Sequence, residues 1–402
     1  MRGYVEFLRV PYAARLLGGT LLGRLPNGMA LLAIVLHVRA EGGTYPLAGG
    51  LSAVFGLAMA AGQPVLGRAM DRYGQGAVLL PAAVASAAGF AVVAVVGVDP
   101  LPVTVAAVVV AGIATPPLEA GLRALWPDVL GGPAQVQAAY ALDAAAQELL
   151  YSVGPLLVVG AALVSTEAAL VLTGLLGIAG TLVVACSGPS RRWRPIPRAA
   201  DWLGPLRSTG LRLLLCVLVF AGVALGVFAI GAAAYAERSG NDAASGVLLA
   251  AMAAGALVGG LAYGARTWYG DPSRRLRWLL AGLAAGYLPL VWAPGLALMV
   301  PLAFVSGIFL APVLACCFSL VDGLAPAGTV TEAFAWIVAA VTAGGSLGSF
   351  AAGYGQEFGG VPGAFAGAAV GGLLALLLCL AGARLLHPRA DAAAVAEPAA
   401  VR

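Results

Sequence analysis

The chain has 402 residues, of which 61% are hydrophobic and 10% are charged, and its formal net charge is +4 at pH 7. Roughly a quarter of the residues of a typical soluble protein are charged, so this composition excludes an ordinary soluble domain. The small net charge does not indicate a nucleic-acid partner. Apolar stretches of about 20 residues, the length that crosses a bilayer as a helix, recur along the whole chain. The sequence therefore predicts an all-α integral membrane protein in contact with a lipid bilayer.

Taken in chain order, the apolar stretches predict twelve transmembrane helices. The first stretch is too long for the apolar part of a signal peptide, so we expect it to remain as a span. The predicted spans are 12–38, 47–67, 77–98, 101–124, 138–164, 168–187, 210–236, 244–266, 277–293, 296–320, 332–354 and 361–386.

The arginines predict how these spans are oriented. Most of them fall at alternate ends of the predicted spans, whereas the opposite ends carry only Arg39 and Arg238. Because basic residues are in excess on the cytoplasmic side of membrane proteins, both termini are expected in the cytoplasm. The chain has no Lys and is rich in Ala and Gly, which is typical of a GC-rich bacterial genome. We expect a multi-pass protein of a bacterial cytoplasmic membrane.

The longest polar stretch divides the chain nearly in half. It spans 187–209, contains several Arg and Pro residues, and is expected to be a solvated linker, with binding of anionic lipid headgroups as a secondary role. The predicted domains are an N-terminal six-helix bundle (1–190), a cytoplasmic linker (191–209), a C-terminal six-helix bundle (210–387) and a disordered tail (388–402).

The two halves contain similar segments. Gly112–Pro117 in the fourth span corresponds to Gly307–Pro312 in the tenth, and Gly67–Gly74 has a weaker counterpart in Gly260–Gly270. An internal duplication in a membrane chain is typical of transporters, whose substrate site lies between the repeats near the middle of the bilayer.

The stretch Gly67–Leu79 is a short charged segment between two uncharged apolar runs, and it predicts a tight turn at one membrane interface. Together with the twelve spans and the central loop, it resembles the major facilitator superfamily, whose signature between spans two and three reads Gly-x-Leu-x-Asp-Arg-x-Gly-Arg-Lys. Four residues match the signature, while Ala69 replaces its Leu and Gln75-Gly76 replace its basic pair. The matching residues are Gly67, Asp71, Arg72 and Gly74.

The resemblance implies a fold of twelve helices in two pseudo-symmetric halves, and a cytoplasmic gate in which the signature latches that side shut. Asp71 is expected to interact with neighbours of Arg72 or with the start of span eleven, where Glu332 is predicted to cap the helix. Arg123 lies where exporters of the superfamily often carry an Arg, although the flanking Gln-Gly is absent, and we assign it to the gate.

A second partial match, Gly154-Pro155 in span five, is similar to the Gly-Pro-x-x-Gly-Gly motif of drug–proton antiporters. Val158 and Val159 stand at its last two places. Proline removes a helix hydrogen bond and glycine tolerates irregular backbone, so helix bends or breaks are expected at Pro26, Pro116, Pro117, Gly154, Pro155 and Pro312. In span one, Pro26-Asn27-Gly28 predicts a break that lines a polar cavity.

Ionisable residues inside spans are costly and therefore informative. Five polar residues are candidates for substrate binding or proton coupling: Arg24, Asn27, Glu119, Asp143 and Glu148. Arg24 and Glu148 are expected at similar depth near the middle of the membrane, with Glu119 and Asp143 nearer the cytoplasm. Glu119 and Arg123 share a helix face because they are four residues apart.

Several interpretations of these residues remain open. Arg24 either binds an anion or carboxylate, or adjusts a proton-carrying Glu148, or forms a fixed ion pair with Glu148 or Glu119. We hypothesise that Glu148 is ionised while Arg24 is near and takes a proton when substrate occupies Arg24. Asp143 and Gln147 either take part in this chemistry or satisfy polar groups at the interface of the two halves.

The function expected from these features is secondary active transport, as proton-coupled efflux of a small organic compound by alternating access. The first alternative is uptake of a small carboxylate-bearing metabolite. The second is a non-transporting membrane protein, such as a sensor or a lipid-modifying enzyme. The sequence contains no catalytic triad, metal cluster or phosphate-binding loop, so we expect no enzyme activity, no cofactor and no metal. We expect a monomer.

Overall fold

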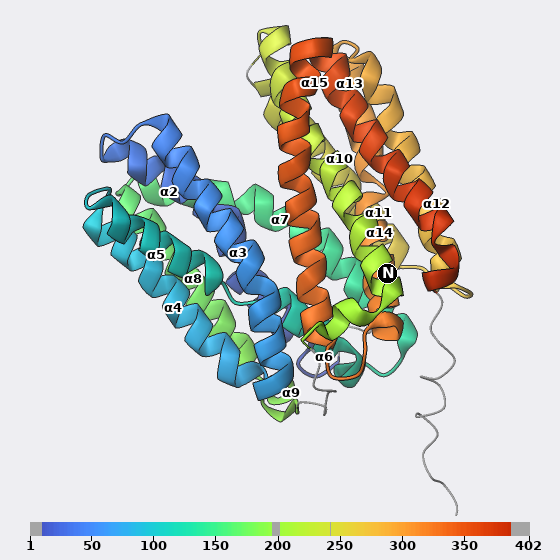
Figure 1. Ribbon diagram of the computed structural model, residues 1–402, viewed down its shortest axis with the longest axis horizontal. Helices are drawn as coiled ribbons and strands as arrows, with labels where there is room; N and C mark the ends of the chain where they lie inside the picture. The colour runs from blue at the N-terminus through green and yellow to red at the C-terminus, as the bar shows by residue number, and fades with distance from the viewer. Residues whose placement is uncertain (1–9, 195–201, 242, 387–402) are drawn as a thin grey trace, which may run out of the picture. The chain divides into compact units, whose positions relative to one another are not determined.

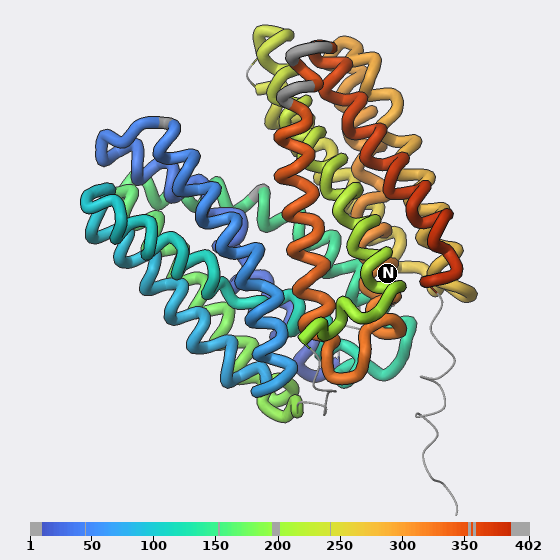
Figure 2. The backbone as a smooth tube through the Cα atoms, viewed as in Figure 1, coloured from blue at the N-terminus to red at the C-terminus, as the bar shows by residue number. Residues whose placement is uncertain are grey.

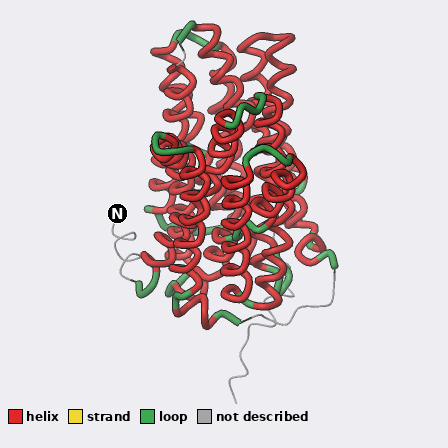
Figure 3. Tube along the Cα trace, turned by 90° about the vertical axis from the view of Figure 1, so that its left-hand side faces the viewer, coloured by secondary structure: helices red, strands yellow, loops and turns green. Residues whose placement is uncertain are grey.

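The computed structural model describes residues 10–194, 202–241 and 243–386. In these ranges the chain forms helices joined by loops, without a strand (Figure 3). Eleven segments of the described chain are long and apolar enough to cross a membrane. The predicted all-α integral membrane fold is confirmed. The predicted disordered tail, 388–402, lies outside the described residues.

The chain forms two compact units. The first comprises Met1–Pro197 with two short segments, Leu261–Arg266 and Phe334–Ala339, and the second comprises Arg198–Gly260, Thr267–Ala333 and Ala340–Arg402. The boundary between Pro197 and Arg198 falls inside the predicted linker 191–209.

The first unit is a bundle in which α2 packs on α7 and α8, α4 packs on α5 and α8, and α3 packs on α5 (Figure 1). Its buried interior includes the rings of Phe55 and Phe90, whose centroids are 5.6 Å apart. The helices are α2 (Ala13–Ala40), α3 (Tyr45–Tyr73), α4 (Gln75–Val96), α5 (Leu101–Ile113), α6 (Leu118–Val129), α7 (Pro133–Ala162), α8 (Thr166–Ala185) and α9 (Gly188–Arg192).

Glycines let the backbone of α2 approach its two neighbours. A Cβ atom on Gly180 of α8 would overlap the backbone of Gly23, and a Cβ atom on Gly154 of α7 would lie 2.8 Å from the carbonyl carbon of Gly28. Such small-residue contacts are the usual way in which membrane helices pack closely. They hold the middle of α2 against both α7 and α8.

The predicted break in span one is wrong. Helix α2 runs without interruption through Pro26, whose ring packs against α8 at Gly177, where a Cβ atom would lie 3.4 Å from Cγ of Pro26. A proline is tolerated inside a membrane helix when neighbouring helices support the backbone. Pro155 likewise lies inside the continuous helix α7, and Pro312 lies in the first turn of α14.

The predicted turn at Gly67–Leu79 is much shorter than expected. Helix α3 continues to Tyr73 and helix α4 begins at Gln75, so Gly74 alone reverses the chain. Its backbone angles, φ 92° and ψ 158°, belong to a region that is essentially restricted to glycine. The charged residues Arg68, Asp71 and Arg72 therefore lie on the last turns of α3.

The second unit contains the helices that follow the linker, apart from the segments Leu261–Arg266 and Phe334–Ala339, which belong to the first unit. One of these helices, α15, has non-helical angles at Gly360 (φ 61°, ψ −154°), where it divides into two arms (Figure 2). The two arms provide the candidate spans Val330–Ala352 and Gly359–Ala381. The elements are η1 (Gly204–Arg207), α10 (Thr209–Ser239), α11 (Ala243–Gly264), α12 (Pro272–Tyr287), η2 (Leu288–Trp292), α13 (Leu296–Gly307), α14 (Leu310–Leu324), α15 (Val330–Ala381) and η3 (Ala383–Leu386).

The predicted span 277–293 corresponds to α12 together with η2. This segment is not among the eleven that meet the criteria of length and apolarity, because α12 has 16 residues and carries Arg274, Arg275 and Arg277 in its first turns. The number of twelve spans therefore stays a prediction.

The two units share one local arrangement. Helices α5 and α13 end at Ile113 and Gly307, and the chain then starts a second helix, α6 or α14. In the first unit, Gly62 and Gly112 bring α3 and α5 into backbone contact, and in the second Gly259 and Gly307 do the same for α11 and α13. The glycines preceding α4 and α12, Gly74 and Gly270, both have positive φ angles. These matched contacts agree with the internal duplication indicated by the sequence.

Candidate functional site

The first unit contains a buried cluster of charged side chains centred on Arg24 of α2. Its guanidinium donates from Nη1 to Oδ1 of Asp143 at 2.7 Å, and from Nη2 to Oε2 of Glu119. Nη2 also donates to Oε1 of Gln147 at 3.0 Å. The three acceptors come from α6 and α7, so Arg24 joins three helices.

A second arginine completes the cluster. Arg123 donates from Nε to Oδ2 of Asp143 at 2.8 Å, and its Nη2 lies 3.3 Å from Oε2 of Glu119. Each oxygen of Asp143 thus accepts from a different arginine, whereas both arginines reach the same oxygen of Glu119. Tyr140 supports Arg123 by donating from its hydroxyl to the backbone carbonyl of Arg123 at 3.3 Å.

This four-residue network, Arg24, Glu119, Arg123 and Asp143, is almost completely shielded from solvent. Asp143 has no exposed surface and the other three residues are at most 5% exposed. Two guanidinium groups and two carboxylates leave the network formally neutral. A buried ion pair is tolerated only when its charges are compensated and its remaining hydrogen-bonding groups are satisfied, and charge neutrality meets the first of these conditions.

A break in the fourth span places Glu119 and Arg123. The chain is not helical at Ala114–Pro117, and helix α6 starts directly after Pro117. Gln63 of α3 stabilises the break by donating from Nε2 to the carbonyl of Thr115 at 3.2 Å. Glu119 consequently lies in the first turn of α6, where the positive end of the helix dipole favours an anion.

Three buried polar atoms on α2 lack a hydrogen-bond partner in the structure, and one of them is the hydroxyl oxygen of Thr20. The other two are Nε of Arg24, a donor, and Oδ1 of Asn27, an acceptor. The two residues are three positions apart on the helix, so they are neighbours on its surface. A buried polar atom without a partner is costly, so these two atoms mark a place where a polar ligand or water gains hydrogen bonds.

The structure places Arg24 differently from several expectations. Arg24 was expected to pair with Glu148 or with Glu119, and the structure shows the ion pair with Glu119. Arg24 also forms an ion pair with Asp143. Both carboxylates were expected nearer the cytoplasm than Arg24. Glu148 is half-buried on α7 beside Gln147 and is not among the ion-pair partners of Arg24. Asp143 is fully buried and bonded to both arginines, and its alternative role at an interface of the two halves stays a prediction.

The residues of the first unit that were assigned to the gate occupy two locations. Gly67, Asp71 and Arg72 lie on the last turns of α3, where Asp71 is buried and Arg72 places its guanidinium 5.2 Å from the ring centre of Tyr73. Arg123 belongs instead to the network around Arg24. The interaction of Asp71 with the start of span eleven stays a prediction.

Gln75, which replaces a basic residue of the superfamily signature, has a structural role that sequence reasoning missed. It is fully buried and donates from Nε2 to the carbonyl of Gly121 at 2.9 Å. Its Oε1 accepts from the hydroxyl of Ser190 at 3.1 Å. The side chain thereby links the start of α4 to α6 and α9, and no periodicity in the sequence indicated this contact.

Glu332 lies in the first turn of α15, three residues after the N-cap, and its role in capping the helix stays a prediction. The N-cap is Thr329, whose side chain makes no capping bond and instead donates to the carbonyl of Pro326 at 2.7 Å. The carboxylate of Glu332 lies against Gly204 of η1, where a Cβ atom would be 2.8 Å from Oε2. Gly204 has a φ angle of 52°, so both space and backbone conformation favour glycine there.

Within the described ranges, no group of three or more His, Cys, Asp and Glu side chains is placed to hold a metal ion. The first unit offers a neutral charge network with unused hydrogen-bonding atoms of Arg24 and Asn27 beside it. These groups can exchange ion-pair partners, take up a proton on a carboxylate and hydrogen-bond to a polar molecule.

Several solved membrane transporters have a similar fold. The human organic anion transporter MFSD10 is 18% identical with a TM-score of 0.71, covering 91% of this chain and 98% of that one. A bacterial homologue of the iron transporter ferroportin in the outward-facing state is 15% identical with a TM-score of 0.73, covering 92% and 98%. The E. coli fucose:proton symporter FucP is 15% identical with a TM-score of 0.68, covering 95% and 99%.

No curated protein matches the sequence significantly. The family described as the Major Facilitator Superfamily matches residues 16–326, which is most of the chain. The family match indicates a membrane transporter. The chain belongs to the Major Facilitator Superfamily.

Proposed function

We propose that this protein is a secondary active transporter that exports a small organic compound in exchange for protons. The observation that carries the proposal is the buried, neutral network of Arg24, Glu119, Arg123 and Asp143, with the unused atoms of Arg24 and Asn27 beside it. Ionisable residues inside membrane spans are costly and typically belong to substrate or proton pathways.

The neutrality of the network links proton uptake to a change in its ion pairs. A proton on one carboxylate leaves two arginines facing a single negative charge. An uncompensated buried charge is strongly unfavourable, so the arginine released from the protonated carboxylate must find another partner. A substrate that accepts hydrogen bonds at Arg24 supplies such a partner and so favours the protonated state. A cationic substrate instead favours the ionised carboxylates and competes with the proton, as exchange for protons requires.

Glu119 is the carboxylate of the network best suited to exchange a proton. Asp143 is fully buried and uses both oxygens for arginine bonds of 2.7 and 2.8 Å. The bonds from the two arginines to Glu119 share one oxygen, and its side chain is 7% exposed. We assign Glu119 as the first proton carrier and Glu148, half-buried and near Gln147 on α7, as the second.

The direction of transport rests on this site and on the partial Gly154-Pro155 match to drug–proton antiporters. The structural neighbours share the fold while their descriptions name different cargoes, a fucose:proton symporter and an organic anion transporter among them, and a shared fold does not define a substrate. Proton coupling in one neighbour supports an ion-driven mechanism for this chain by analogy only.

Uptake of a carboxylate-bearing metabolite is the second candidate, and the unused Nε of Arg24 favours it. Both Nη atoms of Arg24 are already bonded to protein acceptors. A substrate carboxylate can therefore form two hydrogen bonds with Arg24, one to Nε and one to an Nη atom, only if Glu119 or Asp143 gives up its bond to Arg24. The two candidates are separated by the sign of the coupled proton flux.

The test uses the purified protein in liposomes that contain a pH-sensitive dye, with an imposed pH gradient and a panel of small organic cations, neutral compounds and carboxylates. We expect a substrate of this protein to drive proton movement in the opposite direction. Glu119→Gln should abolish the coupled flux, whereas Asp128→Asn, at an exposed acid near the end of α6, should leave it intact. Substrate flux that ignores the gradient in the unmodified protein rules out proton coupling, and co-directional flux of protons and a carboxylate establishes uptake instead.

A further inference from the structure

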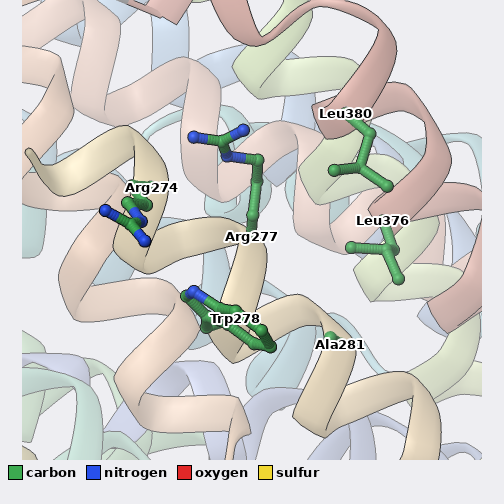
Figure 4. Close-up of a pocket in the computed structure, with 6 residues that line it drawn as sticks. All are labelled: Arg274, Arg277, Trp278, Ala281, Leu376 and Leu380. Carbon is green, nitrogen blue, oxygen red and sulfur yellow. The ribbon is translucent and has the colours of Figure 1, made fainter.

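The second unit contains a pocket of about 280 Å³ between α12 and the final part of α15 (Figure 4). Four of its lining residues come from the first turns of α12, and two leucines face them from α15. The pocket is far in sequence from the charge network around Arg24. Its lining residues are Arg274, Arg277, Trp278, Ala281, Leu376 and Leu380.

A close helix contact defines one end of this pocket. A Cβ atom on Gly372 of α15 would lie 3.1 Å from Cα of Ala284 on α12, so the two helices touch there. Helix α12 also packs against η3, which directly follows α15, and Leu380 lines the pocket together with Arg274 and Arg277, so the two helices run antiparallel. Along α15, Leu376 and Leu380 lie one and two turns after the contact at Gly372. Along α12, which runs in the opposite direction, Ala281 and Arg277 lie at successive turns before the contact at Ala284.

The pocket therefore has a cationic end and an apolar wall. Its lining includes two arginines and no acidic residue. Arg277 buries its Nε atom without a hydrogen-bond partner, and Arg274 is exposed. The acid nearest in sequence, Asp271, accepts from the backbone N–H and the hydroxyl of Ser273 at 2.9 and 2.6 Å as the N-cap of α12.

The apolar wall faces outward from the unit. Leu380 is 48% exposed and the indole of Trp278 is 71% exposed. Leu380 belongs to the helix segment Gly359–Ala381, which is long and apolar enough to span a membrane, and Trp278 lines the same pocket from α12. Exposed leucines on such a segment contact lipid chains, and an exposed Trp near the end of a span is typical of the membrane interface.

We propose that this pocket binds an anionic phospholipid of the surrounding leaflet, with its phosphate on Arg274 and Arg277 and an acyl chain along Ala281, Leu376 and Leu380. Arginine guanidinium groups bind phosphate oxygens with paired, charge-assisted hydrogen bonds. Basic pockets between membrane helices recognise anionic headgroups in this way. A free phosphate ion uses only the cationic end and leaves the apolar wall unmatched, so the combination selects a lipid.

The experiment measures phospholipid binding to the delipidated, full-length protein in detergent by native mass spectrometry. The probes are phosphatidylglycerol, phosphatidylcholine of the same acyl chains, and inorganic phosphate as a competitor. We expect one phosphatidylglycerol molecule to bind more tightly than phosphatidylcholine. The double variant Arg274→Gln/Arg277→Gln should bind it about tenfold more weakly, since it loses charge-assisted hydrogen bonds.

Arg212→Gln is the matched control, because Arg212 is an exposed arginine of the same unit on α10 and does not line the pocket. The control should retain the binding of the unmodified protein. Leu376→Asn/Leu380→Asn should weaken phosphatidylglycerol while leaving any binding of inorganic phosphate unchanged. Size-exclusion chromatography verifies that each variant is monodisperse, and Trp278→Phe provides a conservative second variant of the wall, for which we expect a smaller loss.

Three results overturn the proposal. The first is equal affinity for phosphatidylglycerol and phosphatidylcholine. The second is an equal loss of phosphatidylglycerol affinity in Arg212→Gln and in Arg274→Gln/Arg277→Gln, which indicates a general effect of charge. The third is complete displacement of phosphatidylglycerol by inorganic phosphate with no effect of the leucine variants, which indicates an anion site only. Since no transport is measured, the proposal stands or fails independently of the proposed function.

Discussion

The guanidinium of Arg24 on α2 donates from Nη1 to Oδ1 of Asp143 on α7 at 2.7 Å, across 119 residues of sequence. Neither residue has appreciable exposed surface. The second oxygen of Asp143 accepts from Arg123 on α6, so this one carboxylate ties together three helices of the first unit. The stability of the first unit and its proposed coupling chemistry therefore depend on the same residues.

Replacing Asp143 with Asn should destabilise the protein strongly. The change keeps the size of the side chain but leaves two buried arginines facing a single carboxylate, and breaking a buried ion pair from one side costs about 3–5 kcal/mol. The measurement is the midpoint of thermal unfolding of the purified protein in detergent. Asp128→Asn, at an exposed position, serves as the control and should unfold like the unmodified protein. Equal midpoints for Asp143→Asn and the control show that the network does not stabilise the fold.

The substitutions Arg24→Gln and Glu119→Gln should be strongly non-additive. Each alone leaves an unbalanced buried charge, whereas the double variant restores neutrality. Contacting residues of this kind show coupling energies of about 0.5–3 kcal/mol. A double-mutant cycle on unfolding midpoints in denaturant gives this coupling directly. Additive effects mean that the bond seen between the two side chains contributes nothing to stability.

Gly74→Ala should destabilise the first unit by about 1–3 kcal/mol, because the backbone angles of Gly74 are essentially restricted to glycine. Open space surrounds Gly74, so the cost arises from the backbone rather than from a clash. Gly76→Ala is the matched control: Gly76 also has open space around it but lies inside α4. Thermal unfolding of both variants tests the point, and a loss of stability in Gly76→Ala as large as in Gly74→Ala contradicts it.

Gly180→Ala should separate α8 from α2 and disturb the position of Arg24. The added Cβ atom would overlap the backbone of Gly23. Movement of a side chain cannot relieve this overlap, because the atoms in contact belong to the backbone. Overpacking of this kind costs about 1–3 kcal/mol. Gly160→Ala on α7, where open space surrounds the glycine, is the control. Thermal unfolding and coupled transport should both decline for Gly180→Ala only, and unchanged transport would show that the α2–α8 contact does not position the site.

Gln75→Arg restores a basic residue of the superfamily signature, yet it should destabilise this protein. Gln75 is fully buried and bonded to the carbonyl of Gly121 and the hydroxyl of Ser190. In this variant a charged guanidinium replaces the neutral amide. Neither group that bonds to the amide, the carbonyl of Gly121 or the hydroxyl of Ser190, carries a charge that would compensate the guanidinium. Gln75→Ala tests the amide itself, for which we expect a loss of about 1–3 kcal/mol. A stable Gln75→Arg variant means that the arginine side chain reaches an anionic partner or solvent.

Hydropathy was sufficient to predict the membrane class and the approximate spans, because a helix in a bilayer must be apolar over a length set by the bilayer itself. It failed at details that depend on neighbours. Pro26 lies in an unbroken helix because α8 packs against it, and the charged segment around Asp71 is helical because Gly74 alone makes the turn. Hydropathy also leaves the span predicted at 277–293 undecided, because the three arginines of α12 lower its mean apolarity.

The sequence by itself determined which ionisable residues inside the spans were significant, because each is costly in an apolar environment. It also indicated the duplication and the family. Only the tertiary structure decided which of these residues meet. Arg24 is bonded to Glu119 and Asp143 rather than to Glu148, because glycine contacts at Gly180 and Gly154 set how α2 lies against α7 and α8, and the break before α6 brings Glu119 within reach. Pairings between residues 95 and 119 positions apart depend on helix packing, which local sequence patterns do not contain.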